Sequence, residues 1–126
     1  MAWIELITVL ALIQYLVFGA LVGRARGRYG VKAPATTGHE VFERTYRVQM
    51  NTLETLVVFL PALWLAARYW SPAWVAAVGA VYLLGRLVYA RSYIANPASR
   101  SMGYLLSMLP TMALLLATLV GVLRSL

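Results

Sequence analysis

The sequence predicts an all-α integral membrane protein, a bundle of four transmembrane helices. Hydrophobic residues make up 62% of the 126 residues and charged residues only 12%, whereas a typical soluble domain carries about 25% charged residues. Four apolar runs, each long enough for a hydrocarbon core of about 30 Å, are separated by short segments that contain Gly, Pro or basic side chains. We expect residues 1–126 to form a single four-helix domain.

The first apolar run covers residues 3–22 and predicts a helix over about residues 3–26. This run is too long and too weakly basic at its start for a secretory signal peptide, so we expect it to remain as a membrane span. Residues 23–40 are rich in Gly, Pro and basic side chains, and they predict a water-exposed connection.

The second helix is predicted over residues 40–69, which at about 1.5 Å per residue exceeds the hydrocarbon core, so its polar first half should project into water. Tryptophans at both sides of the turn at residues 70–74 are typical of a membrane interface. The third helix is predicted over residues 73–94, ending before Pro97, and the fourth over residues 102–123.

The net charge of +7 is unevenly distributed between the two sides of the predicted bundle. Most basic residues lie in or near the first and third loops, namely Arg24, Arg26, Arg28, Lys32, Arg91 and Arg100. The positive-inside rule therefore predicts that these loops are cytoplasmic and that both termini are outside. Basic residues spread among membrane spans favour lipid head groups and anionic ligands over a nucleic acid. No endoplasmic-reticulum retention signal is present, which favours a bacterial inner membrane.

Polar side chains form a stripe along the segment FERTYRVQMNTLE of the second helix. Arg44, Arg47, Asn51 and Glu54 fall within an arc of roughly 80°, so they can contact one ligand together. A solvated helix end explains Arg44 equally well, but Asn51 and Glu54 lie deeper, where a charge costs roughly 2.5 to 3.5 kcal/mol and needs a partner. Because Arg47 and Glu54 are seven residues apart, we expect each to pair with a ligand or a neighbouring helix rather than with the other.

A second stripe lies on the third helix, where Tyr82, Arg86, Tyr89 and Tyr93 fall within an arc of roughly 60°. Tyrosine at a helix end is usually an interface anchor. Two tyrosines and an arginine on the same stripe, close to Arg100, are also suited to form the walls of a polar pocket.

Several kinds of chemistry find no support in the sequence. The chain has no cysteine, so a nucleophilic thiol must come from a ligand. His39, the one histidine, has no carboxylate or cysteine partners at metal-ligand spacing, and we expect a surface loop residue and no metal site. No Ser/His/Asp arrangement and no pair of acids indicates a hydrolase.

Three segments together resemble a known family. FERTYRVQMNTLE, LVVFLPALWLAA and VYLLGRLVYARSYIANPASR are similar, in one register without gaps over about residues 20–105, to the membrane-associated proteins in eicosanoid and glutathione metabolism (MAPEG). The similarity is to the branch that contains microsomal glutathione transferases and leukotriene-C synthase. Thr55 and Gly27 depart from the pattern of that branch, which has tyrosine and arginine there.

The resemblance implies a homotrimer that binds glutathione between adjacent subunits near the cytoplasmic face. The residues that it implies as glutathione contacts are Arg26, Arg47, Gln49, Asn51, Glu54, Tyr89 and Tyr93. It further implies that Arg100 stabilises the glutathione thiolate. The second substrate would be a lipophilic electrophile or lipid hydroperoxide that reaches the site through the membrane lipids.

Two other functions remain open from the sequence. The family also includes a lipid-binding protein without enzyme activity, so a non-catalytic scaffold is one alternative. A small four-helix multidrug exporter is the other, although such carriers typically depend on a carboxylate deep in the first helix and Glu5 lies at its very end.

Overall fold

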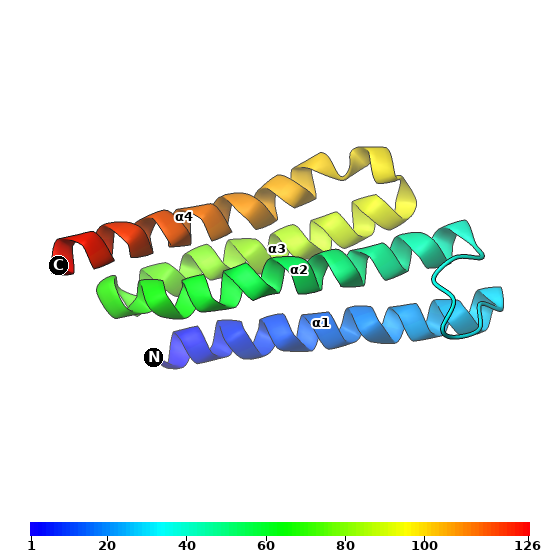
Figure 1. The fold of residues 1–126 in the computed structure, drawn as a ribbon, viewed down its shortest axis with the longest axis horizontal. Helices are drawn as coiled ribbons and strands as arrows, with labels where there is room; N and C mark the ends of the chain where they lie inside the picture. Colours follow the sequence, from blue (N-terminus) through cyan, green and yellow to red (C-terminus); the bar gives the residue numbers. More distant parts are fainter.

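The computed structural model describes all 126 residues and consists of four long helices (Figure 1). They are α1 (Ala2–Tyr29), α2 (Glu40–Tyr69), α3 (Pro72–Ala95) and α4 (Ser101–Ser125), with a short 3-10 helix, η1 (Pro97–Ser99), before α4. Both termini lie at one end of the bundle, and the α1–α2 loop and η1 lie at the other. Each long helix is apolar enough to cross a membrane. The chain is therefore an integral membrane protein of the predicted all-α class.

The α1–α2 connection is shorter than predicted, because α1 continues through the basic stretch to Tyr29. The expectation that residues 23–40 are all connection is wrong. Arginine is a good helix former, and helix α1 ends only at Gly30, whose φ of 68° favours glycine. His39 closes the loop and caps α2, since its Nδ1 accepts a hydrogen bond from the Val41 N–H (3.1 Å).

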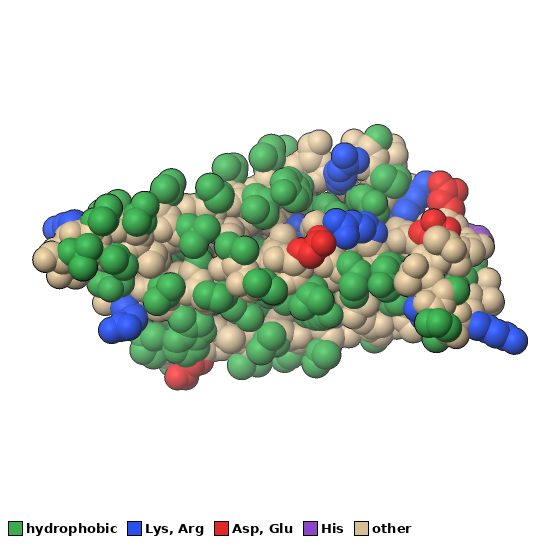
Figure 2. Space-filling view, viewed as in Figure 1, with side chains coloured by type: hydrophobic (Ala, Val, Ile, Leu, Met, Phe, Trp, Pro, Cys, Tyr) green, Lys and Arg blue, Asp and Glu red, His purple; other side chains and the backbone are tan.

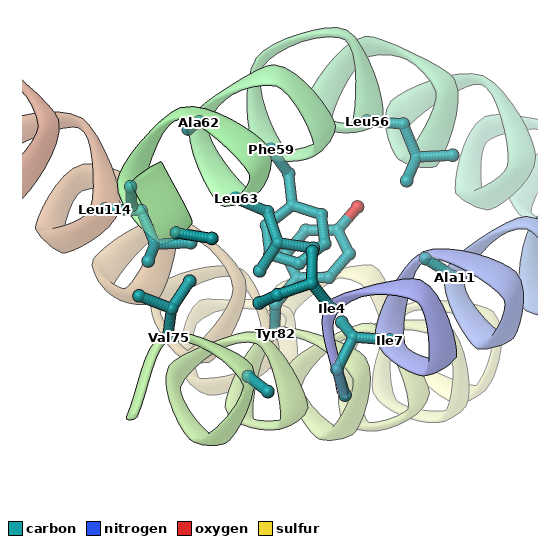
Figure 3. Close-up of a cluster of buried hydrophobic side chains, with 13 residues drawn as sticks. Ile4, Ile7, Ala11, Leu56, Phe59, Ala62, Leu63, Val75, Tyr82 and Leu114 are labelled. Carbon is teal, nitrogen blue, oxygen red and sulfur yellow. The ribbon is translucent and has the colours of Figure 1, made fainter. Parts of the chain in front are cut away.

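The largest apolar cluster fills the half of the bundle that contains the termini. Ile4 and Ile7 of α1, Phe59 of α2, Tyr82 of α3 and Leu114 of α4 belong to it. The rings of Phe59 and Tyr82 stack face to face, with centroids 3.8 Å apart, in the middle of this cluster (Figure 3). The opposite half of the bundle, nearer to the α1–α2 loop, holds the polar residues of interest.

Helices α3 and α4 approach each other closely at two glycines. A Cβ on Gly85 would lie 2.5 Å from the carbonyl carbon of Leu106, and a Cβ on Gly103 would collide with the backbone of Tyr89. This close approach brings Ser107 of α4 within hydrogen-bonding distance of α3.

The outer surface is largely apolar, as expected for contact with lipid tails (Figure 2). Leu16, Leu84 and Leu109 are among the exposed side chains. Charged groups gather mainly at the end that carries the α1–α2 loop, while an acidic and a basic group lie side by side in the apolar middle of the face shown.

Candidate functional site

The polar stripe of α2 lies on an outer face of the bundle. Arg47 donates from Nη2 to Oε1 of Glu54 at 3.0 Å, and the two side chains are 47% and 59% exposed. The expectation that these residues would not pair with each other is therefore wrong. They are separated by about 10.5 Å of helix rise, but both side chains are long and extend along the same uncovered face. Asn51, between them, is partly buried.

Arg44 at the start of the stripe is held within the fold. It forms an ion pair with Glu40 and donates to the carbonyl of Ile94 (3.3 Å), which ties α2 to the end of α3. This residue is thus satisfied without a ligand.

Arg86 lies beneath the stripe and is completely buried. Its Nη1 donates to Oδ1 of Asn51 (2.7 Å) and to Oγ1 of Thr52 (3.3 Å), and its Nε donates to Oγ of Ser107 (2.9 Å). Its Nη2 is buried without a hydrogen-bond partner. The guanidinium lies 4.4 Å from the ring centroid of Tyr89. This cation has no ion-pair partner, because both ion pairs of the chain involve other arginines.

The tyrosines of α3 occupy different depths. Tyr82 is completely buried and its hydroxyl is 2.8 Å from that of Thr55, so it belongs to the core. The expectation that the arginine of this stripe forms a pocket wall is wrong, because neighbouring helices cover Arg86 completely. Tyr89 is buried and stacks on the half-buried Tyr93, with ring centroids 5.4 Å apart. Of the four residues of this stripe, Tyr93 is the one that extends towards the surface.

Arg100 follows the break at Asn96 and Pro97 and is exposed. It donates from Nη1 to the carbonyl of Pro97 (3.1 Å), which leaves most of its guanidinium available to a ligand. It lines a hollow of about 490 Å³ together with Ser101, Tyr104 and Leu105. Tyr104 is not among the residues predicted for the site, although it follows Arg100 by four positions and therefore lies on the same side of the start of α4.

Arg26 of α1 and Gln49 of α2 lie where these two helices face each other. Arg26 donates to the carbonyl of Ala35 (2.7 Å) and its guanidinium lies over the ring of Phe42. Gln49 contacts α1, since its amide nitrogen is 2.8 Å from where a Cβ on Gly19 would be. Within one chain, the predicted glutathione contacts therefore lie in two separate groups. The stripe group comprises Arg47, Asn51, Glu54, Tyr89 and Tyr93, and the α1-side pair comprises Arg26 and Gln49.

No group of three or more His, Cys, Asp or Glu side chains comes together as metal ligands would. The candidate site is instead a set of arginine, amide, carboxylate and phenol groups. Such groups bind an organic ligand that carries both carboxylates and an ammonium group.

These features define a small four-span membrane protein with a partly exposed row of polar side chains on one face of α2. The MAPEG family model matches residues 4–120, and the chain belongs to this family. The chain is 51% identical over 121 residues to an uncharacterized protein of Synechocystis sp., covering 96% of this chain and 88% of the relative. It is 38% identical over 117 residues to human microsomal glutathione S-transferase 2 (93% and 78% covered). It is 39% identical over 92 residues to leukotriene C4 synthase of Cavia porcellus (73% and 61% covered).

Proposed function

We propose that this protein is a membrane-bound glutathione transferase, which activates glutathione as a thiolate for conjugation to lipophilic electrophiles or for reduction of lipid hydroperoxides. The observation that carries the proposal is the row of a cation, an amide and an anion on the outer face of α2, formed by Arg47, Asn51 and Glu54. The relatives named as glutathione S-transferase 2 and leukotriene C4 synthase support the same activity.

The charges of glutathione are complementary to this row. The tripeptide carries two carboxylates, one ammonium group, two peptide groups and a thiol. Arg47 would bind a carboxylate, Glu54 the ammonium group, and Asn51 a peptide or carboxylate oxygen. The exposed Arg47–Glu54 pair would exchange its mutual contact for contacts with a ligand that supplies both opposite charges.

Arg100 is proposed to stabilise the thiolate. A free thiol with a pKa near 8.5 is only a few per cent ionised at neutral pH, and lowering this pKa by about two units requires about 2.7 kcal/mol of preferential stabilisation. One nearby guanidinium in a partly desolvated site can supply that amount. The thiol proton then leaves to solvent, and the sulfur forms a bond to the electrophilic carbon as the leaving group departs with the bonding electrons.

We also propose that the site is completed in a homotrimer, where the stripe group of one protomer faces the α1-side pair of the next. The separation of these two groups within one chain supports this arrangement. The site would lie towards the cytoplasmic end, because the basic loops lie at that end of the bundle. Residence in a bacterial inner membrane stays a prediction from the sequence.

The test is purification in detergent, followed by calorimetry with glutathione and a conjugation assay with a small aromatic halide. We expect saturable glutathione binding and turnover that depends on both substrates. Binding without turnover on halide or hydroperoxide substrates would instead indicate the non-catalytic scaffold. Absence of glutathione binding would overturn the proposed function.

A further inference from the structure

Arg86 is a buried cation in the membrane-spanning part of α3, about 13 Å along the helix from its end at Ala95. An intramembrane charge is costly and is usually retained for a function. Its contacts cross three helices, since Asn51 and Thr52 belong to α2 and Ser107 belongs to α4. These contacts explain how the cation is held, but not why a cation is needed there.

The contact between Arg86 and Asn51 determines how the amide of Asn51 is oriented. A guanidinium only donates hydrogen bonds, so the amide atom that faces it at 2.7 Å must be the carbonyl oxygen Oδ1. The Nδ2 group then points away from Arg86. Asn51 is partly exposed and lies between Arg47 and Glu54 along the stripe, and its two N–H donors are not used by the contact with Arg86.

We propose that Arg86 is a positioning residue, which holds the Asn51 amide so that this position offers only hydrogen-bond donors to the ligand. The position then selects a ligand that places a carbonyl or carboxylate oxygen against Asn51. Without Arg86 the Asn51 amide is free to rotate by about 180°. In the flipped orientation its carbonyl oxygen, and not its N–H groups, would face the ligand oxygen and repel it. This inference rests on the proposed function, in which the ligand is glutathione.

The substitution Asn51→Asp separates a binding role of Asn51 from a purely structural one. The aspartate has nearly the same shape and gives Arg86 a full counter-charge, so the fold is retained and its melting temperature is equal or higher. However, aspartate offers no donor to the ligand. We expect the glutathione KM to rise at least tenfold with kcat changed less than twofold, because Arg100 and not Asn51 acts on the thiol.

A double-mutant cycle tests whether Arg86 acts through Asn51. In the parent, Asn51→Ala should weaken glutathione binding severalfold. In an Arg86→Met background, where the amide is no longer oriented, the same change should have little effect on binding. Ser107→Ala is the matched control, because it removes another hydrogen bond of the same guanidinium without touching Asn51. It should lower the melting temperature and leave KM unchanged.

The outcomes distinguish this inference from the proposed function. If the parent binds glutathione and Asn51→Asp binds it equally well, the positioning role is refuted while the proposed function stands. The same holds if Ser107→Ala raises KM as much as Asn51→Asp, since the network would then act only through the fold. If the parent does not bind glutathione, the proposed function fails and this inference fails with it. If Arg86→Met does not fold, Asn51→Asp and Ser107→Ala still keep Arg86, and either of the two contrary results above still refutes the positioning role.

Discussion

Arg100 is placed by a local break in the helical chain. The Asn96 side chain accepts from the N–H of Ala98, η1 follows, and α4 begins directly after Arg100. The guanidinium is thus exposed beside a hollow instead of being buried between helices. A basic residue at this place could also act only as a positive-inside anchor of the membrane topology. An anchor would not change the pKa of a bound thiol, whereas a thiolate-stabilising residue would lower it.

The substitution Arg100→Ala should lower kcat by about 10²-fold at neutral pH and leave much of the glutathione affinity, because other residues hold the carboxylates. Loss of the guanidinium raises the pKa of the bound thiol towards its free value. The remaining activity of the variant should therefore increase as the pH is raised, because more of the bound thiol is then ionised. Ultraviolet absorbance of the thiolate, titrated with glutathione bound, measures this effect.

Arg91→Ala is the control for insertion and topology, since Arg91 is an exposed basic residue near the same end of the bundle. It should keep both turnover and the thiolate fraction. Equal thiolate fractions in the Arg100 variant and the parent at neutral pH would remove Arg100 from the mechanism.

Glu54→Gln should weaken glutathione binding at least severalfold, because the amide cannot neutralise the ligand's ammonium group. The variant keeps an oxygen that accepts from Arg47, so the contact along α2 and the fold should be retained. Calorimetry gives the affinity, and Glu5→Gln, at the other end of the bundle, serves as control. Unchanged affinity of the Glu54 variant would show that this carboxylate is not a ligand residue.

At the scale of the elements, topology follows from four antiparallel spans joined by short connections. The α1–α2 loop and η1 lie at one end, and the α2–α3 turn at Trp70 and Ser71 lies at the other. Each connection is too short to cross the bilayer again. The side of the membrane on which one loop lies therefore determines the sides of the others.

Single cysteines at Thr36 and at Ser71 should be labelled from opposite sides of the membrane, with Thr36 reacting from the cytoplasm. Both positions are exposed, and the parent chain has no cysteine that would add background. Thr36 is preferable to His39, because His39 caps α2 and its replacement would disturb the helix start. Impermeant maleimide, applied to intact cells and to inverted vesicles, gives the measurement. Labelling of both positions from one side would contradict the four-span topology.

At the scale of the whole molecule, the proposed homotrimer would bring the two groups of predicted ligand residues together at a site shared by two protomers. In a ring of three identical subunits, each interface combines one face of a protomer with a different face of the next. Arg26 on α1 and Glu54 on α2 would then serve the same site from different chains.

Subunit mixing tests this arrangement. Arg26→Ala and Glu54→Gln, co-expressed with different affinity tags and purified through both, should give mixed trimers in which one interface has both halves intact. At glutathione concentrations below KM, these trimers should regain about one third of parent activity, because an intact site needs one residue from each chain. Activity equal to the average of the two single variants would place the site within one chain.

The membrane spans and the polar stripes were predictable from the sequence, because both depend on local properties. About 20 consecutive apolar residues are sufficient for one span, and an angle of 100° per residue is sufficient to place Arg47, Asn51 and Glu54 on one face. The end of α1 is not predicted correctly, because its Gly and Arg residues indicate a loop where the helix continues to Tyr29.

The partners of these side chains were decided only by the tertiary structure. Periodicity places Tyr82, Arg86 and Tyr89 on one stripe, but it does not tell which part of that stripe other helices cover. Asn51 meets Arg86 across 35 positions of sequence, and Ser107 reaches Arg86 because α3 and α4 approach at Gly85 and Gly103. Arg47 and Glu54 pair because no neighbouring helix covers their face of α2. Burial and hydrogen bonding depend on how helices pack together, and packing is a property that no single helix carries in its own residues.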